Sequence, residues 1–388
     1  MKKMIKLTVA ASALLSTAAA YSQATPPAAA PAPEVVPAAP DGALEFSGYL
    51  DVSGNYLSKS KNFVVPNDPG TPVGPSRVFD LERNGVAIRQ LAVTLQSLPK
   101  QGLGGLLNIT AGKDAEVISS YGLGGGKKNK IDLTQAVVQY ATGPVIFSAG
   151  KFVTLAGAEV INSSAASNFS RSILFGYAIP FTHTGARATY AVDDTLSLIL
   201  GVNNGWDSFK SHNSSKTVEA GVAYTPSKIV SFSAQGYSGK EQVGGFVDGG
   251  VQGTRNLIDL VGTYNVTDKL TLIANYDYGT QANATLANNA TGRAKWSGIA
   301  GYANYQLSDQ WKVSGRAEYF DDHDGYRTGV AQKWKEATLT LAYLPTKAIE
   351  IRGELRADTS NVASFENSSG TSSGKSQSSV GIEALYKF

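Results

Sequence analysis

From Leu44 to the last residue, hydrophobic and polar positions alternate with a period of two. This period is that of a β-strand with one apolar face, because a helix would repeat every 3.6 residues. The segment 349–358, IEIRGELRAD, shows it most clearly, since its odd positions are apolar or Gly and its even positions are all charged. The pattern predicts sixteen strands, at 44–57, 85–97, 103–114, 131–141, 145–153, 184–192, 195–203, 216–225, 229–239, 255–266, 269–279, 293–306, 311–320, 333–344, 349–358 and 377–388.

The last eleven residues, SSVGIEALYKF, end the chain on an aromatic side chain that shares a face with Val380, Ile382, Ala384 and Tyr386. A soluble edge strand can alternate in the same way, but it rarely ends on outward aromatic residues with nothing to cover them. An apolar face backed by a mostly polar one is typical of a strand between lipid and water. We therefore predict an all-β fold, a transmembrane antiparallel up-and-down β-barrel of about sixteen strands, closed by this segment.

The connections between these strands support a membrane barrel. Seven short connections alternate with eight long ones, of which 154–183 is the longest. Short turns on the periplasmic side and long loops outside are the expected asymmetry of an outer-membrane barrel. This count places both ends of the barrel on the short-turn side and requires an even number of strands.

A tyrosine recurs just before successive short turns. If it faces lipid, the series forms an aromatic girdle at one membrane interface, although Tyr also favours ordinary sheets. The repeat of roughly forty residues matches a propeller blade in length, but each period holds two strands of about ten residues rather than four short ones. The tyrosines are Tyr140, Tyr190, Tyr224, Tyr264, Tyr305, Tyr343 and Tyr386.

The N-terminal region differs from the rest. Residues 1–24 have three Lys followed by an apolar stretch and small residues, which predicts a secretory signal peptide cleaved after Ala24. Residues 25–43 are rich in Pro and Ala and predict an extended periplasmic linker, either a plain spacer or a contact with the cell wall. The barrel domain is expected at 44–388.

Composition narrows the function classes. The chain has no Cys, which excludes disulfide scaffolds and Cys-ligated metal sites. Its formal net charge of +3 falls to zero once the three Lys of the signal peptide are removed, so a nucleic-acid partner is not expected. Beyond the N-terminus no apolar run is long enough for a transmembrane helix.

Several segments resemble a known family. NGVAIRQLAVTLQ (84–96), KIDLTQAVVQY (130–140) and above all the stretch 150–190, with its GAEVI, NFSRS and IPFTHTG pieces, look like the OmpL-like β-barrel porin family of Gram-negative outer membranes. The resemblance extends over the chain after Asp41, with divergent loops. It implies a barrel in the cell outer membrane that passes small solutes, and it says little about which solute.

The long connection 154–183 is the candidate constriction. It carries Glu159, Asn162, Asn168, Arg171 and His183 among Ser and Ala residues. A sixteen-stranded barrel is wide enough to hold water, and a loop folded inward would narrow it and set selectivity through its charges. We expect Glu159 and Arg171 to face the solute. The alternative is an extracellular loop packed on the barrel rim.

Charges of both signs fall on the strand face assigned to the lumen. Opposed acids and bases across a pore create a transverse field that disfavours apolar solutes. They could equally be paired and mutually neutralising on the inner wall, and mixed signs argue against strong ion selectivity. The pore-lining candidates on the strands are Arg187, Arg316, Glu318, Glu336, Arg352, Glu354 and Arg356.

Catalytic and metal chemistry is poorly supported, so we expect no enzyme activity, no cofactor and no metal site. The three histidines, His183, His212 and His323, are not set in a Ser/His/acid pattern on one barrel face. The acidic stretch 320–326 lacks the spacing of a calcium-binding loop.

The sequence therefore predicts an outer-membrane porin for passive diffusion of small hydrophilic solutes or ions. Its expected partners are outer-membrane lipid, these solutes and two further copies in a homotrimer. The alternative is a structural or adhesive barrel whose outer loops bind a partner. Apolar residues filling the lumen face would favour that alternative, and the alternation places polar ones there.

Overall fold

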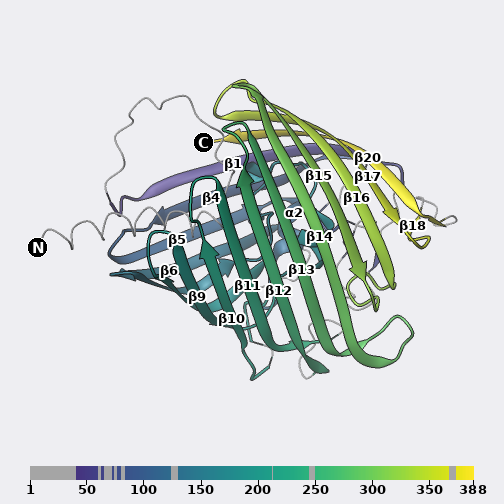
Figure 1. Cartoon of the computed structure of the whole chain (residues 1–388), viewed down its shortest axis with the longest axis horizontal. Helices are drawn as coiled ribbons and strands as arrows, with labels where there is room; N and C mark the ends of the chain where they lie inside the picture. The colour runs from purple at the N-terminus through teal and green to yellow at the C-terminus, as the bar shows by residue number, and fades with distance from the viewer. Residues whose placement is uncertain are drawn as a thin grey trace, which may run out of the picture.

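The computed structural model describes residues 41–59, 63–64, 72–73, 77–79, 84–123, 130–211, 213–243, 250–366 and 373–388. The expected signal peptide, most of the expected linker and His212 lie outside these residues. Sixteen antiparallel strands close into one barrel, each paired with its neighbour in the chain (Figure 1). They are β1 (Glu45–Leu57), β4 (Gly85–Ser97), β5 (Gly102–Ala111), β6 (Ile131–Thr142), β7 (Val145–Val153), β8 (Thr182–Ala191), β9 (Leu196–Asn203), β10 (Thr217–Tyr224), β11 (Val230–Gln242), β12 (Gln252–Asn265), β13 (Leu270–Thr285), β14 (Thr291–Ser308), β15 (Trp311–Asp322), β16 (Gln332–Tyr343), β17 (Ile349–Ser360) and β20 (Ser376–Lys387).

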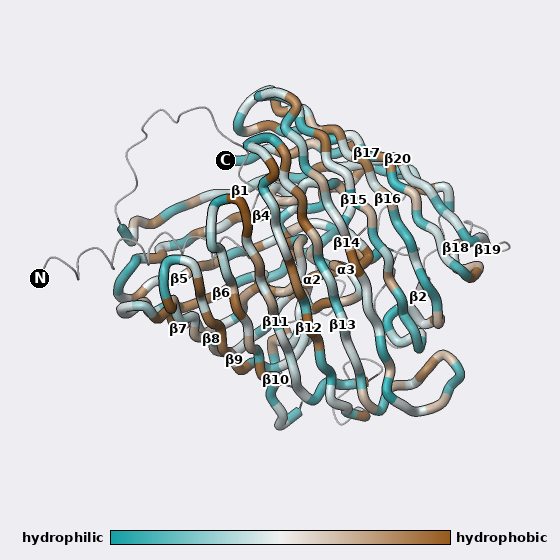
Figure 2. Tube along the Cα trace, viewed as in Figure 1, coloured by the Kyte–Doolittle hydropathy of each residue, from teal (hydrophilic) through white to brown (hydrophobic). Residues whose placement is uncertain are grey.

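The period-two pattern determines which side chains face outward. Along β17 the apolar positions are exposed and the charged positions are buried inside the barrel. Figure 2 shows this alternation as brown residues interspersed with white and teal ones along the strands. The exposed apolar face has no protein to cover it, which is the arrangement expected of a wall in contact with lipid.

The barrel closes where the C-terminal strand meets the first strand, as predicted. The pairing of β1 with β20 runs from Tyr49 opposite Lys387 to Leu57 opposite Ser379. Beyond it, the backbone N–H and C=O of Phe388 bond to Gly48 at 2.9 and 2.8 Å. Every strand of the barrel therefore has two partners, and the barrel has no open edge.

The expected tyrosine girdle lies on the outward face. Tyr140 and Tyr386 are each 51% exposed, and Tyr343 packs against Trp311 with ring centroids 4.7 Å apart. All seven tyrosines lie near the short-turn ends of their strands. A ring of this kind suits a membrane interface, where the aromatic body and the hydroxyl group prefer different media.

Two β-bulges explain why the strand at 85–97 and the region after 130 have mixed patterns. The register between β1 and β4 shifts between Asp51 and Val52, so that Arg89 and Gln90 both turn inward. A second shift, in the pairing of β5 with β6, turns Thr134 and Gln135 inward together. One extra residue reverses the face of everything beyond it.

The long connections differ from the prediction at several strands. The ladder between β13 and β14 continues to Thr285 opposite Thr291, so the predicted loop 280–292 is mostly strand. The residues added to these two strands are polar, such as Gln281 and Asn283, or small, such as Ala282, and the apolar signal therefore ends before the hydrogen-bond ladder does. Two further connections contain small two-stranded pairs, β2 (Phe63–Val64) with β3 (Pro72–Val73) and β18 (Phe365–Glu366) with β19 (Ser373–Gly374).

Three short helical segments lie in the long connections. They are α2 (Lys113–Ile118), the 3₁₀ turn η2 (Ser163–Ala165) and α3 (Ile173–Tyr177). No helix in the described part of the chain is long and apolar enough to cross a membrane. Buried apolar residues of α2 and α3, such as Ile118 and Leu174, join an apolar cluster inside the barrel, so the core of this molecule lies in its lumen.

Candidate functional site

The connection between β7 and β8 folds into the barrel and lies against the inner wall formed by β14 to β17. We call residues 154–181 the inner loop. Two local caps shape it: Asn162 Oδ1 accepts from Ser164 N at the start of η2, and Ser172 Oγ accepts from Phe175 N at the start of α3. The loop therefore has its own structure, and the prediction that it folds inward is confirmed by its contacts with the wall.

Two carboxylates of the wall each hold two consecutive backbone amides of the inner loop. Glu318 on β15 accepts from Ile173 N at 2.7 Å and Leu174 N at 3.1 Å, which are the first amides of α3. Glu354 on β17 accepts from Phe169 N at 2.7 Å and Ser170 N at 3.1 Å. Charge-assisted bonds of this kind are among the stronger hydrogen bonds in proteins, and here they are buried.

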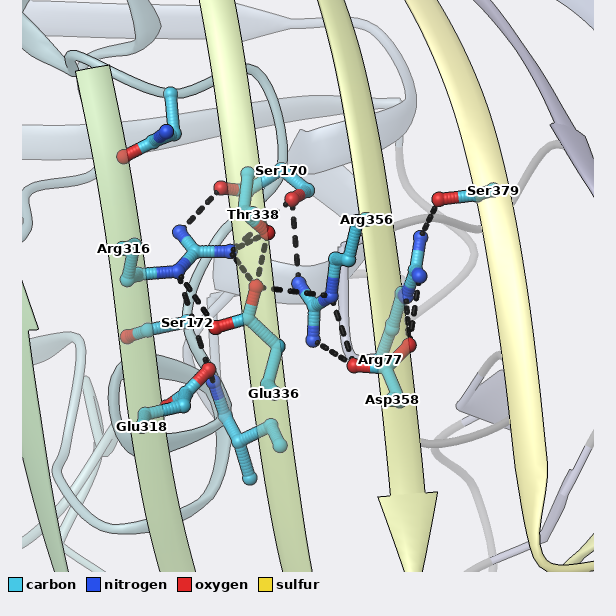
Figure 3. Close-up of polar contacts among 12 residues, drawn as sticks. Arg77, Ser170, Ser172, Arg316, Glu318, Glu336, Thr338, Arg356, Asp358 and Ser379 are labelled. Carbon is cyan, nitrogen blue, oxygen red and sulfur yellow. Dashed lines mark hydrogen bonds and ion pairs between the residues drawn. The ribbon is translucent and has the colours of Figure 1, made fainter.

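Two arginines of the wall donate hydrogen bonds to a carboxylate and to backbone carbonyls of the inner loop, and Figure 3 shows both arginines beside Ser170 of the loop. Arg316 donates to Glu159 Oε1 and to the Ser170 carbonyl, both at 2.7 Å. Arg356 donates to the Arg171 carbonyl at 2.6 Å. Glu336 lies between the two guanidinium groups, 3.1 Å from Arg316 Nε and 3.6 Å from Arg356 Nε.

A second segment of the chain joins this cluster from the connection between β1 and β4. Arg77 donates to Asp358 Oδ2 at 2.6 Å and to Ser379 Oγ at 2.7 Å, as Figure 3 shows. Phe79 stacks on Phe175 of α3 with ring centroids 5.6 Å apart. The inner loop is thus held between the wall and another connection.

Apolar side chains fill the lumen on the long-loop side of this cluster. Trp296, Phe320 and Trp334 point inward from β14, β15 and β16 and are at most 2% exposed. Trp296 Nε1 donates to the Ala178 carbonyl at 3.1 Å, and Tyr177 packs edge-on against Trp334. The prediction of a polar lumen face is wrong at these positions, because the inner loop supplies an apolar surface for them to pack against.

Of the nine predicted pore-lining residues, seven meet at the loop–wall contact. These are Glu159, Arg171, Arg316, Glu318, Glu336, Glu354 and Arg356. Most of them are buried, and the side chain of Glu159 keeps 9% exposure. Arg171 donates to the Ile161 carbonyl at 2.9 Å, while its Nε and Nη1 have no hydrogen-bond partner among the described residues.

The other two predicted residues lie elsewhere. Arg352 pairs with Glu350 and Glu383, each at 2.8 Å, and donates to the Ser163 carbonyl nearer the short-turn end. Arg187 lies on β8, eight strands from β16 in the barrel order and thus on the opposite wall. It pairs with Glu219 at 2.8 Å.

Sequence reasoning missed several residues that hold the inner loop. Arg89 pairs with Asp114 of α2 at 3.3 Å, and Gln90 donates to Asp114 at 2.7 Å and to the Ile161 carbonyl at 2.9 Å. Burial raises the pKa of Asp114, and the nearby Arg89 opposes this shift. The available signal in the sequence was Arg89 itself, a charged residue on an otherwise apolar face of β4, and it lies at the β-bulge.

A further missed group, Asp207, lies in the connection between β9 and β10. Its Oδ1 accepts from Phe181 N and Thr182 N, both at 2.9 Å, and so fixes the point where the inner loop returns to the wall. Burial raises the pKa of Asp207.

Part of the inner wall stays polar and partly accessible. Towards the short turns, several inward residues of β6, β7, β8, β11 and β12 are polar and only half-buried; they include Gln139, Ser148, Thr189, Ser233 and Thr263. The lumen is thus less tightly filled at these positions than where the inner loop meets β14 to β17.

Comparison with known proteins gives one family and many similar folds. The family model described as beta-barrel porin-2, OmpL-like matches residues 43–388. No curated protein sequence matches the chain.

Among solved structures, the outer membrane channel DcaP of Acinetobacter baumannii aligns with a TM-score of 0.58 at 16% identity, covering 89% of this chain and 97% of that one. The anion-selective porin from Comamonas acidovorans gives 0.59 at 13% identity, covering 89% and 99%. OmpT of Vibrio cholerae in its trimer form gives 0.58 at 15% identity, covering 90% and 100%. At these identities the likeness concerns the fold.

Proposed function

Because this chain belongs to the OmpL-like beta-barrel porin-2 family and is an outer-membrane channel, we propose that it passes small hydrophilic solutes through a narrow path beside the inner loop. Transport along this path is passive. The observation that carries the proposal is the set of half-buried polar residues on the inner face of β6, β7, β8, β11 and β12, together with an inner loop that is fixed to β15 and β17.

The contacts of the inner loop argue for a small cross-section. The loop is held by Glu318, Glu354, Arg316 and Arg356, and its apolar side chains pack against the wall. Replacing these buried contacts by water would leave charges without partners, which is strongly unfavourable. The path therefore keeps to the side of Arg187, and its unitary conductance is low for a barrel of sixteen strands.

We also propose a modest preference for anions. In three ion pairs on the inner wall the cation is the more exposed partner: side-chain exposures are 11% for Arg187 against 0% for Glu219, and 21% for Lys312 and 33% for Lys387 against 3% for Glu350. A solute meets the ammonium and guanidinium groups first. The 9% exposed carboxylate of Glu159 limits this preference.

Planar-bilayer recording tests this proposal. The mature protein is refolded in detergent and inserted, and the reversal potential is measured across a potassium chloride gradient. We expect small, stable steps and a reversal potential displaced towards chloride. A cation preference would contradict the role given to the exposed lysines and Arg187.

A second candidate function rests on the apolar filling of the lumen. A closed barrel whose outer loops bind a partner is favoured by the buried Trp296, Phe320 and Trp334. The same bilayer recording separates the two, because a closed barrel gives no steps.

We further propose export by the signal peptide 1–24, a periplasmic linker at 25–43 and assembly into a homotrimer. The trimer form of the similar Vibrio cholerae protein supports the assembly. Native mass spectrometry of the detergent-solubilised protein tests it, with three chains per particle expected and a monomer contradicting it.

A further inference from the structure

A group of basic residues lies on the lipid side of the barrel at its long-loop end. Arg293 and Lys295 on β14, and Lys333 and Lys335 on β16, all occupy outward positions and are exposed. A charge on the lipid side of a barrel wall is unfavourable towards the middle of the membrane and tolerated near the interface. These residues therefore mark the level of the outer headgroups on this side.

The strand register fixes that level. Ile299, Tyr319 and Lys335 lie side by side across β14, β15 and β16. On the short-turn side of Lys335, the next outward residues of β16 are Ala337 and Leu339. Lys335 thus stands at the upper edge of the apolar band, beside an aromatic residue suited to the interface.

Few acids balance the four cations. Asp321 pairs with Lys333 at 3.2 Å, and Asp324 lies beside His323 with its Oδ1 3.1 Å from the ring. Two carboxylates against four cations leave the patch positive. Phosphate groups at headgroup level supply the missing negative charge.

Directly below the basic patch, the outward face carries a row of small residues. Gly301, Ala317, Ala337 and Ala357 are register partners across β14 to β17. A side chain added at Gly301 would meet nothing within 4 Å. With strands about 4.8 Å apart, this shallow lane is roughly 14 Å across.

The lane continues into a groove on neighbouring strands. Ala274 is the register partner of Gly301, and Gly262 is that of Ala274. These two small residues, with Phe232 and Tyr276, line an outward apolar groove of about 350 Å³. The small residues therefore form a depression in a wall that is elsewhere built of Leu, Ile and Tyr.

We propose that the basic patch and the lane together form a docking site for a phosphate-bearing lipid of the outer leaflet, lipopolysaccharide. Its phosphates contact Lys333, Lys335, Lys295 and Arg293, and its acyl chains lie in the lane. Charge complementarity selects this occupant over a twofold contact with a second copy of the chain, because such a contact would oppose two positive patches.

The test uses the mature protein refolded from lipid-free inclusion bodies in detergent, with lipopolysaccharide binding measured by native mass spectrometry. The double variant Lys333→Gln/Lys335→Gln is expected to bind roughly thirtyfold more weakly, at about fivefold for each lysine. The matched control is Lys228→Gln/Lys269→Gln, which removes two exposed lysines from short turns on the opposite rim and leaves binding unchanged.

Two further measurements separate the phosphate contacts from the lane. Ala317→Leu/Ala337→Leu fills the lane and is expected to weaken binding although every lysine remains, whereas Ala384→Leu on the outward face of β20 has no effect. Dephosphorylated lipopolysaccharide is expected to bind as weakly as the lysine variant. The proposal is overturned if Lys333→Gln/Lys335→Gln and Ala317→Leu/Ala337→Leu both bind lipopolysaccharide as tightly as wild type does. It is also overturned if wild type binds phosphatidylglycerol and lipopolysaccharide equally.

Discussion

The carboxylate of Glu354 offers a direct way to release the inner loop without altering the barrel wall. It accepts from Phe169 N and Ser170 N, at 2.7 and 3.1 Å, and from Thr340 Oγ1 at 2.8 Å. Hydrogen bonds to a charged group contribute about 1.5–3 kcal/mol each. Glu354→Ala removes the two loop bonds, so the docked loop loses roughly 3–6 kcal/mol.

This loss shifts the equilibrium between the docked and the released loop by a measurable amount. At 1.4 kcal/mol for each factor of ten, the ratio of released to docked loop rises roughly a hundredfold to ten-thousandfold. The barrel itself persists, because the backbone pairing of β17 with β16 and β20 does not involve the side chain. We therefore expect Glu354→Ala to form barrels that conduct more current, or fluctuate between two levels, in planar bilayers.

The control is Thr359→Ala, an outward substitution on the same strand, which leaves the current unchanged. Heat-modifiable gel mobility verifies that each variant is folded. In a chain that also lacks residues 162–172, Glu354→Ala has no further effect on conductance. A folded Glu354→Ala barrel with the wild-type current refutes the role assigned to these bonds.

Three other changes test separate parts of the structure. Deleting residues 162–172 removes the middle of the inner loop and raises conductance, which single-channel recording measures; an unchanged current contradicts a constriction there. Arg187→Glu places a second acid beside Glu219 and shifts the reversal potential towards the potassium side, whereas Lys228→Glu at a short turn shifts it less. Because burial raises the pKa of Asp114, this carboxyl group binds its proton more readily in the folded protein than in the unfolded chain. The carboxyl group therefore lowers the free energy of unfolding least at a pH below its unfolded pKa of about 3.9. We expect wild type to gain stability relative to Asp114→Asn as the pH falls from neutral towards 4. A difference between their urea unfolding midpoints that does not change with pH contradicts this.

The sequence alone predicted the barrel well because lipid imposes a strict pattern on each strand. All sixteen predicted strands are present, and the closing role of the segment that ends at Phe388 is confirmed. The sequence of each strand shows which of its faces points to lipid, since one face must be apolar along the whole membrane-spanning length. Strand ends were less well predicted, because ladders such as that of β13 continue into polar residues above the membrane.

The lumen was harder to predict, because its contacts join residues far apart in the chain. Nothing local to Glu354 or Phe169 indicates that they meet across 185 positions. The charges themselves were found, since a charged residue on a strand face opposite lipid stands out. Their burial was not, because it depends on how the inner loop packs.

The bulges form an intermediate case. In strict alternation Arg89 shares a face with Leu91 and Val93, and this departure from the pattern does not by itself show the form of the irregularity. The register shift opposite Asp51 and Val52 resolves it, because it turns Arg89 inward to Asp114. A local departure from the pattern was thus a usable sign of a buried ion pair inside the barrel.

Single-channel recording of the wild-type mature protein tests the central claim, that a solute path remains beside a fixed inner loop. Gel mobility and circular dichroism first establish that the barrel is folded. The structure predicts small, uniform conductance steps and a reversal potential displaced modestly towards chloride. A folded barrel that passes no current contradicts the claim and assigns the protein to the closed barrels whose outer loops bind a partner.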